Sequence, residues 1–302
     1  MSPLVVVVGP TAAGKSDLAV ALSRRLGGEI VNADSMQLYR GMDIGTAKLA
    51  LAEREGVPHH LLDVLEPRDE ASVAWFQQEA RRVVDDIRRR GAVPVLVGGS
   101  SLYVRAVVDR LDFPGTVPEV RDRWKARLDE VGPEALHGEL ARVAPEAAAV
   151  ILASNSRRVV RALEVTEITG RPFVATMPPY ESVVGDVVPI GVDVPRDVLD
   201  ERITTRVDRM WDAGLVAEVE RLSEHGLIGS PTASRALGYA QVLAFLRGEI
   251  TEDEARELTI KGTRAFARRQ DRLFRKDPRT TWLRHDAETL VDEAVALVGA
   301  AT

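Results

Sequence analysis

The chain has 302 residues, 45% of them hydrophobic and 28% charged, and these ordinary values exclude collagen-like and wholly disordered proteins. Cysteine is absent, which excludes disulfides, thiolate zinc sites, iron–sulfur clusters and a cysteine nucleophile. The 40 basic and 46 acidic residues give a net charge of -6, which taken alone argues against a nucleic-acid partner.

The start of the sequence lacks the pattern of an export signal. Residues 1–9 contain a short apolar run without a basic region before it or a cleavage site after it. No run in the chain approaches the roughly 20 apolar residues that a membrane span needs. We therefore expect a cytoplasmic protein, and nothing in the sequence demands more than a monomer.

Strand and helix patterns alternate from the beginning of the chain. Short apolar runs that end at turn residues are typical of strands buried on both faces of a parallel sheet, and apolar residues at helical spacing predict the helices between them. The expected elements are strands at 4–8, 29–32, 93–97 and 187–194 and helices at 15–26 and about 73–90. From residue 198 onward the pattern is mostly helical.

Residues 9–16 read Gly-Pro-Thr-Ala-Ala-Gly-Lys-Ser and fit the pattern G-x-x-x-x-G-K-[ST] between a strand and a helix. Its glycines let backbone amides and the helix N-terminus point at an anion. Lys15 adds a positive charge, and the Ser16 hydroxyl is placed to ligate Mg²⁺. The motif predicts a di- or triphosphate site without identifying ATP. The expected diphosphate-binding residues are Gly9, Pro10, Thr11, Ala12, Ala13, Gly14, Lys15 and Ser16.

This phosphate loop predicts an α/β fold with a P-loop nucleoside-triphosphate-hydrolase-like core and a parallel sheet. Prolines, charges and a helical pattern set apart a stretch near residues 114–145. We therefore expect a small helical insertion at 116–145 within a core made of residues 1–115 and 146–302. The core would end in a helical C-terminal region.

An ATPase or GTPase would also carry an Asp at the end of an apolar strand, where it holds Mg²⁺. The strand at 93–97 is followed instead by Gly98-Gly99-Ser100-Ser101. A hydroxyl thus stands where the carboxylate is expected, which weakens a motor or switch function.

Asp34 follows the second predicted strand, so it should lie near the phosphate loop at the carboxyl edge of the sheet. One interpretation is a carboxylate base or a magnesium contact beside the phosphates. The other is a helix N-cap, which Asp or Ser can equally provide. Position alone leaves both open.

Several motifs spread over nearly the whole chain resemble the tRNA dimethylallyltransferase family, also called tRNA isopentenyltransferases. The longest is the stretch from Asp34 to Lys48, which is highly specific. The motifs are residues 9–16, 32–37, 39–48, 58–61, 97–99, 161–164 and 263–270.

The resemblance implies transfer of a dimethylallyl group from its diphosphate to the exocyclic amine of adenosine 37 in tRNA, next to the anticodon. It also implies that the phosphate loop holds this donor rather than ATP. Asp34 is then the candidate base for the weakly nucleophilic amine, and Lys15 stabilises the leaving pyrophosphate together with Mg²⁺ on Ser16. Ser100 matches a position that is usually Thr, and Arg206 matches an arginine near the leaving group.

An amine inside a stacked anticodon loop is reached only when its base is extruded, and the resemblance implies which residues meet the RNA. The expected tRNA-binding residues are Asp34, Ser35, Met36, Gln37, Ser100, Arg121, Arg157, Arg158, Val159, Val160, Arg161, Arg235, Arg268, Arg269, Gln270, Arg272 and Arg275. The chain departs from the family pattern at Ala240, usually basic, and in lacking the aromatic residue after Gln270.

Positive charge gathers between Arg256 and Arg284, where ten basic and three acidic residues give a net +7. Five of the cations recur every three or four positions and should share one helical face. The acids nearby are too few to pair them, so the face predicts a stripe for RNA phosphates rather than a solvated surface. The five are Lys261, Arg264, Arg268, Arg272 and Arg275.

Three other functions stay open. An adenylate prenyltransferase would share the phosphate loop and alkylate free AMP, ADP or ATP, but would not need the basic stripe. A small-molecule kinase would turn over ATP and leave the stretch from Asp34 to Lys48 without a role. A nucleotide-binding RNA partner would bind tRNA without turnover.

His59 and His60 are adjacent and would point apart on a strand or helix, and no Cys or H-x-E pattern joins them. We therefore expect structural or hydrogen-bonding histidines rather than metal ligands.

Overall fold

The computed structural model describes residues 2–301 and divides into two compact units. The first contains the residues up to Asp109 and those from Ser182 onward, and the second is Arg110–Glu181. No helix among residues 2–301 is long and apolar enough to cross a membrane.

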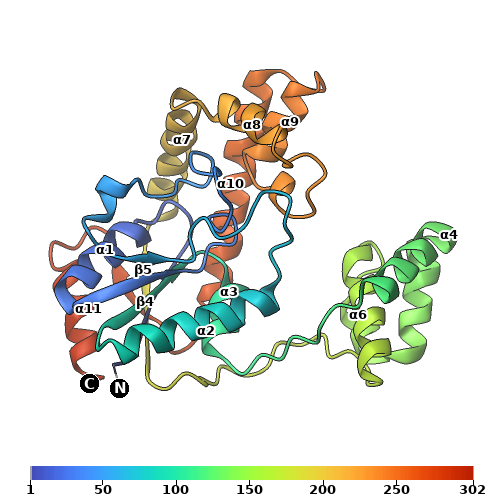
Figure 1. Ribbon diagram of the computed structural model, residues 1–302, viewed down its shortest axis with the longest axis horizontal. Coiled ribbons are helices and arrows are strands. Elements are labelled where there is room, and N and C mark those ends of the chain that lie inside the picture. Colours follow the sequence, from blue (N-terminus) through green and yellow to red (C-terminus); the bar gives the residue numbers. More distant parts are fainter. Residues whose placement is uncertain (1, 302) are drawn as a thin grey trace. The chain divides into compact units, whose positions relative to one another are not determined.

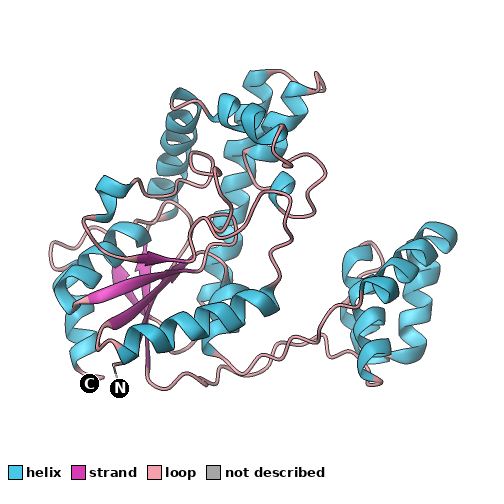
Figure 2. Cartoon of the chain, viewed as in Figure 1, coloured by secondary structure: helices cyan, strands magenta, loops and turns pink. Residues whose placement is uncertain are grey.

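A six-stranded parallel sheet forms the centre of the first unit (Figure 2). Its strands are β1 (Leu4–Val8), β2 (Gly28–Asn32), β3 (His59–His60), β4 (Val93–Gly98), β5 (Val187–Asp193) and β6 (Thr281–Arg284), in the order β3-β2-β4-β1-β5-β6. In the central register, Val6 of β1 lies opposite Leu96 and Pro189. Since every neighbouring pair is parallel, all carboxyl ends meet at one edge.

Helices cover both faces of the sheet, with α2 (Val73–Arg89) and α3 (Ser101–Val108) against one and α1 (Lys15–Leu26) and α11 (Leu290–Gly299) against the other (Figure 1). The side chains of β1 alternate between these two cores. Leu4, Val6 and Val8 pack with α2 and α3, whereas Val5 and Val7 pack with α1. Burial on both faces explains the unbroken apolar run.

The remaining helices of the first unit lie beyond the sheet, and two of them form most of a third core around Tyr39 and Met42. Thr251 begins the longest of them with a capping box, in which its hydroxyl accepts from Glu254 N–H and Glu254 accepts from Thr251 N–H. The helices are α7 (Arg196–Asp212), α8 (Leu215–Ser223), α9 (Tyr239–Leu246) and α10 (Glu252–Phe274), with the short 3₁₀ turns η1 (Leu51–Arg54) and η2 (Ala233–Arg235).

The second unit is wholly helical, with α4 (Pro118–Val143), α5 (Pro145–Val150) and α6 (Ser156–Thr169). Residues 116–145 are helical as expected, but the compact unit extends from 110 to 181. Leu136 and Leu140 of α4 share one core with Leu163 of α6. Assigning residues 146–181 to the core was therefore wrong, because their apolar side chains are buried against α4.

Two strands were missing from the predicted elements. β3 has only two residues, too few to show a period, and β6 lies in a region with a mostly helical pattern. Gly191 of β5 admits β6, because the ring of Trp282 occupies the space that a Cβ at this position would need. Both strands are edge strands, so neither carries the long apolar run of a central strand.

Candidate active site

The phosphate loop connects the end of β1 to the start of α1. Gly9, Ala12 and Gly14 have φ of 145°, 63° and 92°, and Gly14 is the N-cap of α1. Only residues that tolerate positive φ let the loop turn its amides toward one point. The Lys15 ammonium donates to the carbonyl of Pro10 across the loop at 2.7 Å.

Lys15, Asp34 and Arg206 come from three separate segments and line one cavity. Burial and the nearby Arg206 guanidinium lower the pKa of Lys15 to about 8, against the opposing effect of Asp34. Burial also lowers the pKa of Arg206, again opposed by Asp34. Two cations thus share one desolvated place with a single carboxylate, which is the environment an anionic ligand requires.

A turn after β2 fixes the position of Asp34. The side chain of Asn32 accepts from Asp34 N–H at 2.9 Å and donates to the carbonyls of Asp34 and Leu61. Asp34 Oδ1 accepts from Met36 N–H at 2.9 Å, and no helix begins here. Asp34 is therefore not a helix N-cap, and within residues 2–301 its Oδ2 has no hydrogen-bond partner.

Two cavities meet at this carboxylate. The deeper one, about 100 Å³, reaches down to apolar side chains of the sheet and α1. The outer one, about 380 Å³, lies between Met36, Ser100 and the helices α7 and α10. The residues that line both are Thr11, Asp34, Thr46, Gly99, Arg206, Phe266 and Gln270.

Gln270 of α10 ties two strand ends together. Its Oε1 accepts from Thr11 N–H at 2.8 Å, and its Nε2 donates to the carbonyl of Gly99 at 2.7 Å. A side chain at Gly99 would collide with this amide, so glycine is required there. The structure shows Gln270 as a buried side chain that holds the phosphate loop in place and lines both cavities, and the tRNA contact that the resemblance implied for it stays a prediction.

Ser100 and Arg235 lie at the outer cavity. Ser100 is the N-cap of α3, where its hydroxyl accepts from Tyr103 N–H at 3.5 Å. Arg235 is exposed on η2. Both residues are positioned to meet a ligand in that cavity, and Ser35 and Met36 line the same wall.

Phe266 and Thr46 line the site but were not singled out from the sequence. Phe266 of α10 is 41% exposed, and it lines both cavities. An exposed aromatic residue within a charged helix was the available signal. Phe274 of the same helix, by contrast, is 4% exposed and packs in the sheet core.

A family model described as IPP transferase matches residues 37–277. The chain belongs to this family. It is 62% identical to the tRNA dimethylallyltransferase of Thermobifida fusca, over 99% of this chain and 95% of the relative. It is 58% identical to that of a Nocardioides species, over 99% and 96% of the two chains.

Solved structures agree with this assignment. The full-length tRNA isopentenylpyrophosphate transferase of Bacillus halodurans matches with a TM-score of 0.73 and 37% identity, covering 100% of this chain and 98% of that one. A eukaryotic dimethylallyltransferase acting on tRNA matches with a TM-score of 0.80 and 25% identity, covering 100% and 78%. The resemblance to the family and the P-loop-like α/β fold are thus confirmed.

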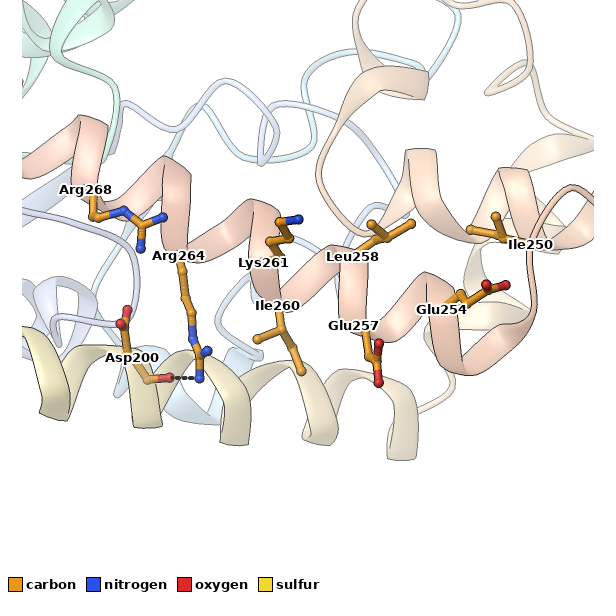
Figure 3. Close-up of a pocket in the computed structure, with 9 residues that line it drawn as sticks. All are labelled: Asp200, Ile250, Glu254, Glu257, Leu258, Ile260, Lys261, Arg264 and Arg268. Carbon is orange, nitrogen blue, oxygen red and sulfur yellow. Dashed lines mark hydrogen bonds between the residues drawn. The ribbon is translucent and has the colours of Figure 1, made fainter.

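The cations of the expected basic stripe on α10 have two roles: some are exposed to solvent, and others bind neighbouring elements. Lys261 and Arg268 of α10 are exposed beside a groove of about 690 Å³ between α7 and α10 (Figure 3). Arg264 turns toward α7, where it donates to the carbonyl of Asp200 and to Thr204 Oγ1. Part of the stripe therefore holds the two helices together.

At the C-terminal end of the stripe, one cation is likewise paired within the fold and another is exposed. Arg275 pairs with Asp193 and Asp271 and stacks over the ring of Trp282 at 4.1 Å. Arg272 is exposed, as is Arg269 on the neighbouring face. Four cations of α10 face solvent and remain suited to phosphates, namely Lys261, Arg268, Arg269 and Arg272.

The predicted RNA-binding residues of the second unit include buried, ion-paired and exposed side chains. Val159 and Val160 are 1% and 6% exposed and pack in the helical core, so contacts from their side chains to RNA are ruled out. Arg121 and Arg161 both pair with the buried Glu164 at 3.0 Å. Arg157 is exposed, and Arg158, also exposed, donates to the carbonyl of Ala175.

His59 and His60 each form a hydrogen bond within the fold. His59 Nδ1 bonds to the carbonyl of Val57, burial lowers the pKa of His59, and His60 bonds to Glu29. Both are hydrogen-bonding histidines, as expected. Residues 2–301 contain no group of three acidic, His or Cys side chains able to hold a metal. Ser16 lines the cavity beside Lys15, so Mg²⁺ fits here only with a phosphate ligand supplying most of its oxygens.

Proposed function

We propose that this chain transfers a dimethylallyl group from dimethylallyl diphosphate to the exocyclic amine of adenosine 37 in tRNA. The bond between the allylic carbon and the diphosphate oxygen breaks, and a carbon–nitrogen bond forms. The amine proton passes to Asp34, and diphosphate leaves. The observation that carries this proposal is the carboxylate of Asp34 at the junction of two cavities, beside Lys15 of the phosphate loop and Arg206 of α7.

The deeper cavity suits the donor. Lys15, Arg206 and the loop amides would bind the diphosphate and stabilise the charge that develops as it leaves. Ser16 would hold Mg²⁺, which supplies further neutralisation of the leaving group. Apolar side chains line the rest of the cavity and would surround the dimethylallyl tail, namely Ala19, Ile30, Leu49, Leu62 and Val97.

The outer cavity suits an extruded adenine. Phe266 and Met36 offer flat and apolar surfaces for stacking, and the hydroxyls of Ser35 and Ser100 offer hydrogen bonds. Asp34 lines both cavities, so the amine of a base held here would point at the donor carbon. This arrangement supports Asp34 as the base.

The exposed arginines support an anticodon stem-loop as the partner. Those of α10 lie beside the site, and Arg157 and Arg158 lie on the second unit. A monomeric state remains a prediction. A cytoplasmic location remains a prediction.

The test is a product assay with three possible outcomes. The protein is incubated with dimethylallyl diphosphate, Mg²⁺, AMP, ATP and an unmodified tRNA that carries adenosines at positions 36 to 38. Nucleoside masses are then measured after digestion, and prenyladenosine at position 37 is the expected product. Prenylated free AMP with unmodified tRNA would overturn the proposal in favour of an adenylate prenyltransferase. ATP turnover without any prenyl product would point to a kinase.

A further inference from the structure

A buried carboxylate on α8 holds the loop that carries Thr46. Glu218 is 2% exposed and accepts from three consecutive backbone amides, those of Asp43, Ile44 and Gly45, at 3.1, 2.9 and 3.3 Å. The hydroxyl of Tyr239 donates to the same carboxylate at 2.5 Å. Glu218 itself lines neither of the two cavities of the site.

Four donors at one carboxylate form a built anchor rather than a chance contact. A buried carboxylate is costly unless its oxygens are hydrogen-bonded, and here both are. The ring of Tyr239 occupies the space that a side chain at Gly45 would need, so the loop must carry glycine to approach. Burial and the Glu218 charge raise the pKa of the Tyr239 hydroxyl, which keeps it a donor.

The anchored loop lines the outer cavity at Gly45 and Thr46. The carbonyl of Thr46 accepts from Arg206 Nη2 at 3.3 Å and from Gln37 Nε2 at 3.1 Å. Thr46 Oγ1 in turn donates to the carbonyl of Met42 at 2.6 Å, which closes the loop on itself. The carbonyl therefore has a fixed position and orients the guanidinium that lies beside Asp34.

We propose that Glu218 is a positioning residue for the transfer reaction, acting through the loop at 43–46 on Arg206. The inference rests on the proposed function, because it assigns the leaving diphosphate to Arg206. A misplaced guanidinium weakens stabilisation of the charge that develops on that group. Distant residues that set such geometry can change rates by as much as about 100-fold.

The test is a double-mutant cycle. Glu218→Gln keeps the volume but turns an amide donor toward the loop amides or the Tyr239 hydroxyl. We expect its kcat to fall by about 10-fold or more, with the KM for tRNA nearly unchanged. In an Arg206→Ala background the same change should alter kcat less than about twofold, because its target is gone. Glu220→Gln, an exposed position on the same helix, is the matched control.

A second readout needs no turnover. Inorganic pyrophosphate binding, followed by calorimetry, should weaken in Glu218→Gln but not in Glu220→Gln, and should be insensitive to Glu218 once Arg206 is removed. This arm still decides the inference if the wild-type protein fails to prenylate tRNA, which would sink the proposed function alone.

Equal losses with and without Arg206, or unchanged kcat and pyrophosphate affinity in Glu218→Gln, would overturn the inference. If Glu218→Gln does not fold, Tyr239→Phe replaces it, since it removes one donor and leaves three amides. Tyr239→Phe should give a smaller loss of kcat in the same direction. No loss in this variant at wild-type melting temperature would also overturn the inference.

Discussion

Three charged side chains set the chemistry at the scale of single residues. Asp34 is held by a turn that uses only one of its oxygens, so the other remains available for a proton. Burial lowers the pKa of Lys15 and of Arg206, the Arg206 guanidinium lowers the pKa of Lys15 further, and Asp34 opposes the shift in both. A bound diphosphate would relieve the repulsion between the two cations. The site is therefore organised for an anion before it arrives.

Asp34→Asn separates charge from geometry. The amide oxygen can still accept from Met36 N–H, so the turn should survive. Loss of the base should lower the single-turnover rate by at least about 100-fold, with tRNA affinity within about threefold of wild type. Rapid-quench kinetics and filter binding check the two quantities. A rate within threefold of wild type would remove Asp34 as the base.

The lowered pKa of Lys15 gives a pH prediction. Below its pKa of about 8 the side chain is charged and attracts the diphosphate, and above it the free protein carries a neutral amine. Pyrophosphate affinity of Lys15→Met relative to wild type should therefore be about 10-fold lower at pH 7 and approach the wild-type value as pH rises toward 10. Calorimetry at several pH values measures this ratio. Titration of pyrophosphate itself affects both proteins equally and cancels in this ratio. An affinity ratio that stays constant from pH 7 to 10 would contradict the prediction.

Elements differ in how far their function could be predicted from the sequence. The phosphate loop is a local pattern whose residues spacing alone predicted. For Asp34, position left a base and a helix N-cap open, and only the family resemblance favoured the base. Glu218, Gln270 and Phe266 act on segments more than 100 positions away, and no local pattern reports such a contact. Even the basic face of α10 was predicted as one stripe because helical spacing shows which side chains share a face, and not what that face packs against.

Arg268 and Arg272 represent the part of α10 that faces solvent. Changing both to Gln should weaken tRNA binding at low salt and lower the slope of log K against log salt by about 1 to 2, since each lost phosphate contact removes slightly less than one unit. Filter binding between 50 and 300 mM salt measures the slope. Arg82→Gln with Arg89→Gln removes the same charge from α2 and should leave the slope unchanged. An unchanged slope in the α10 variant would make this face a solvated surface.

At the scale of the whole molecule, one region connects the two units: the chain leaves the first unit after Asp109 and returns to it at Ser182. Asp109 is fully buried and pairs with Arg105 at 2.7 Å and Arg279 at 2.8 Å. Its backbone accepts from Arg81 at 2.7 Å and forms an antiparallel bridge with Ser182. The segment that leaves the first unit at Asp109 and the segment that returns at Ser182 are thus both held at this ion network. No sequence pattern predicts this network, because its members are spread from position 81 to 279.

Asp109→Asn removes the charge of this network while keeping its volume. The buried Arg105 and the partly exposed Arg279 then lose the charge of this carboxylate, which should lower the free energy of unfolding of the first unit by about 3 kcal/mol. Hydrogen exchange followed by mass spectrometry is the measurement, because it reports each segment separately. Exchange should rise in α3 and around residues 277–284 and stay unchanged in α4 and α6, whose core is independent. Asp112→Asn, exposed three residues further on, is the control. Equal exchange in both variants would show that the ion network does not stabilise the segments at Asp109 and Ser182.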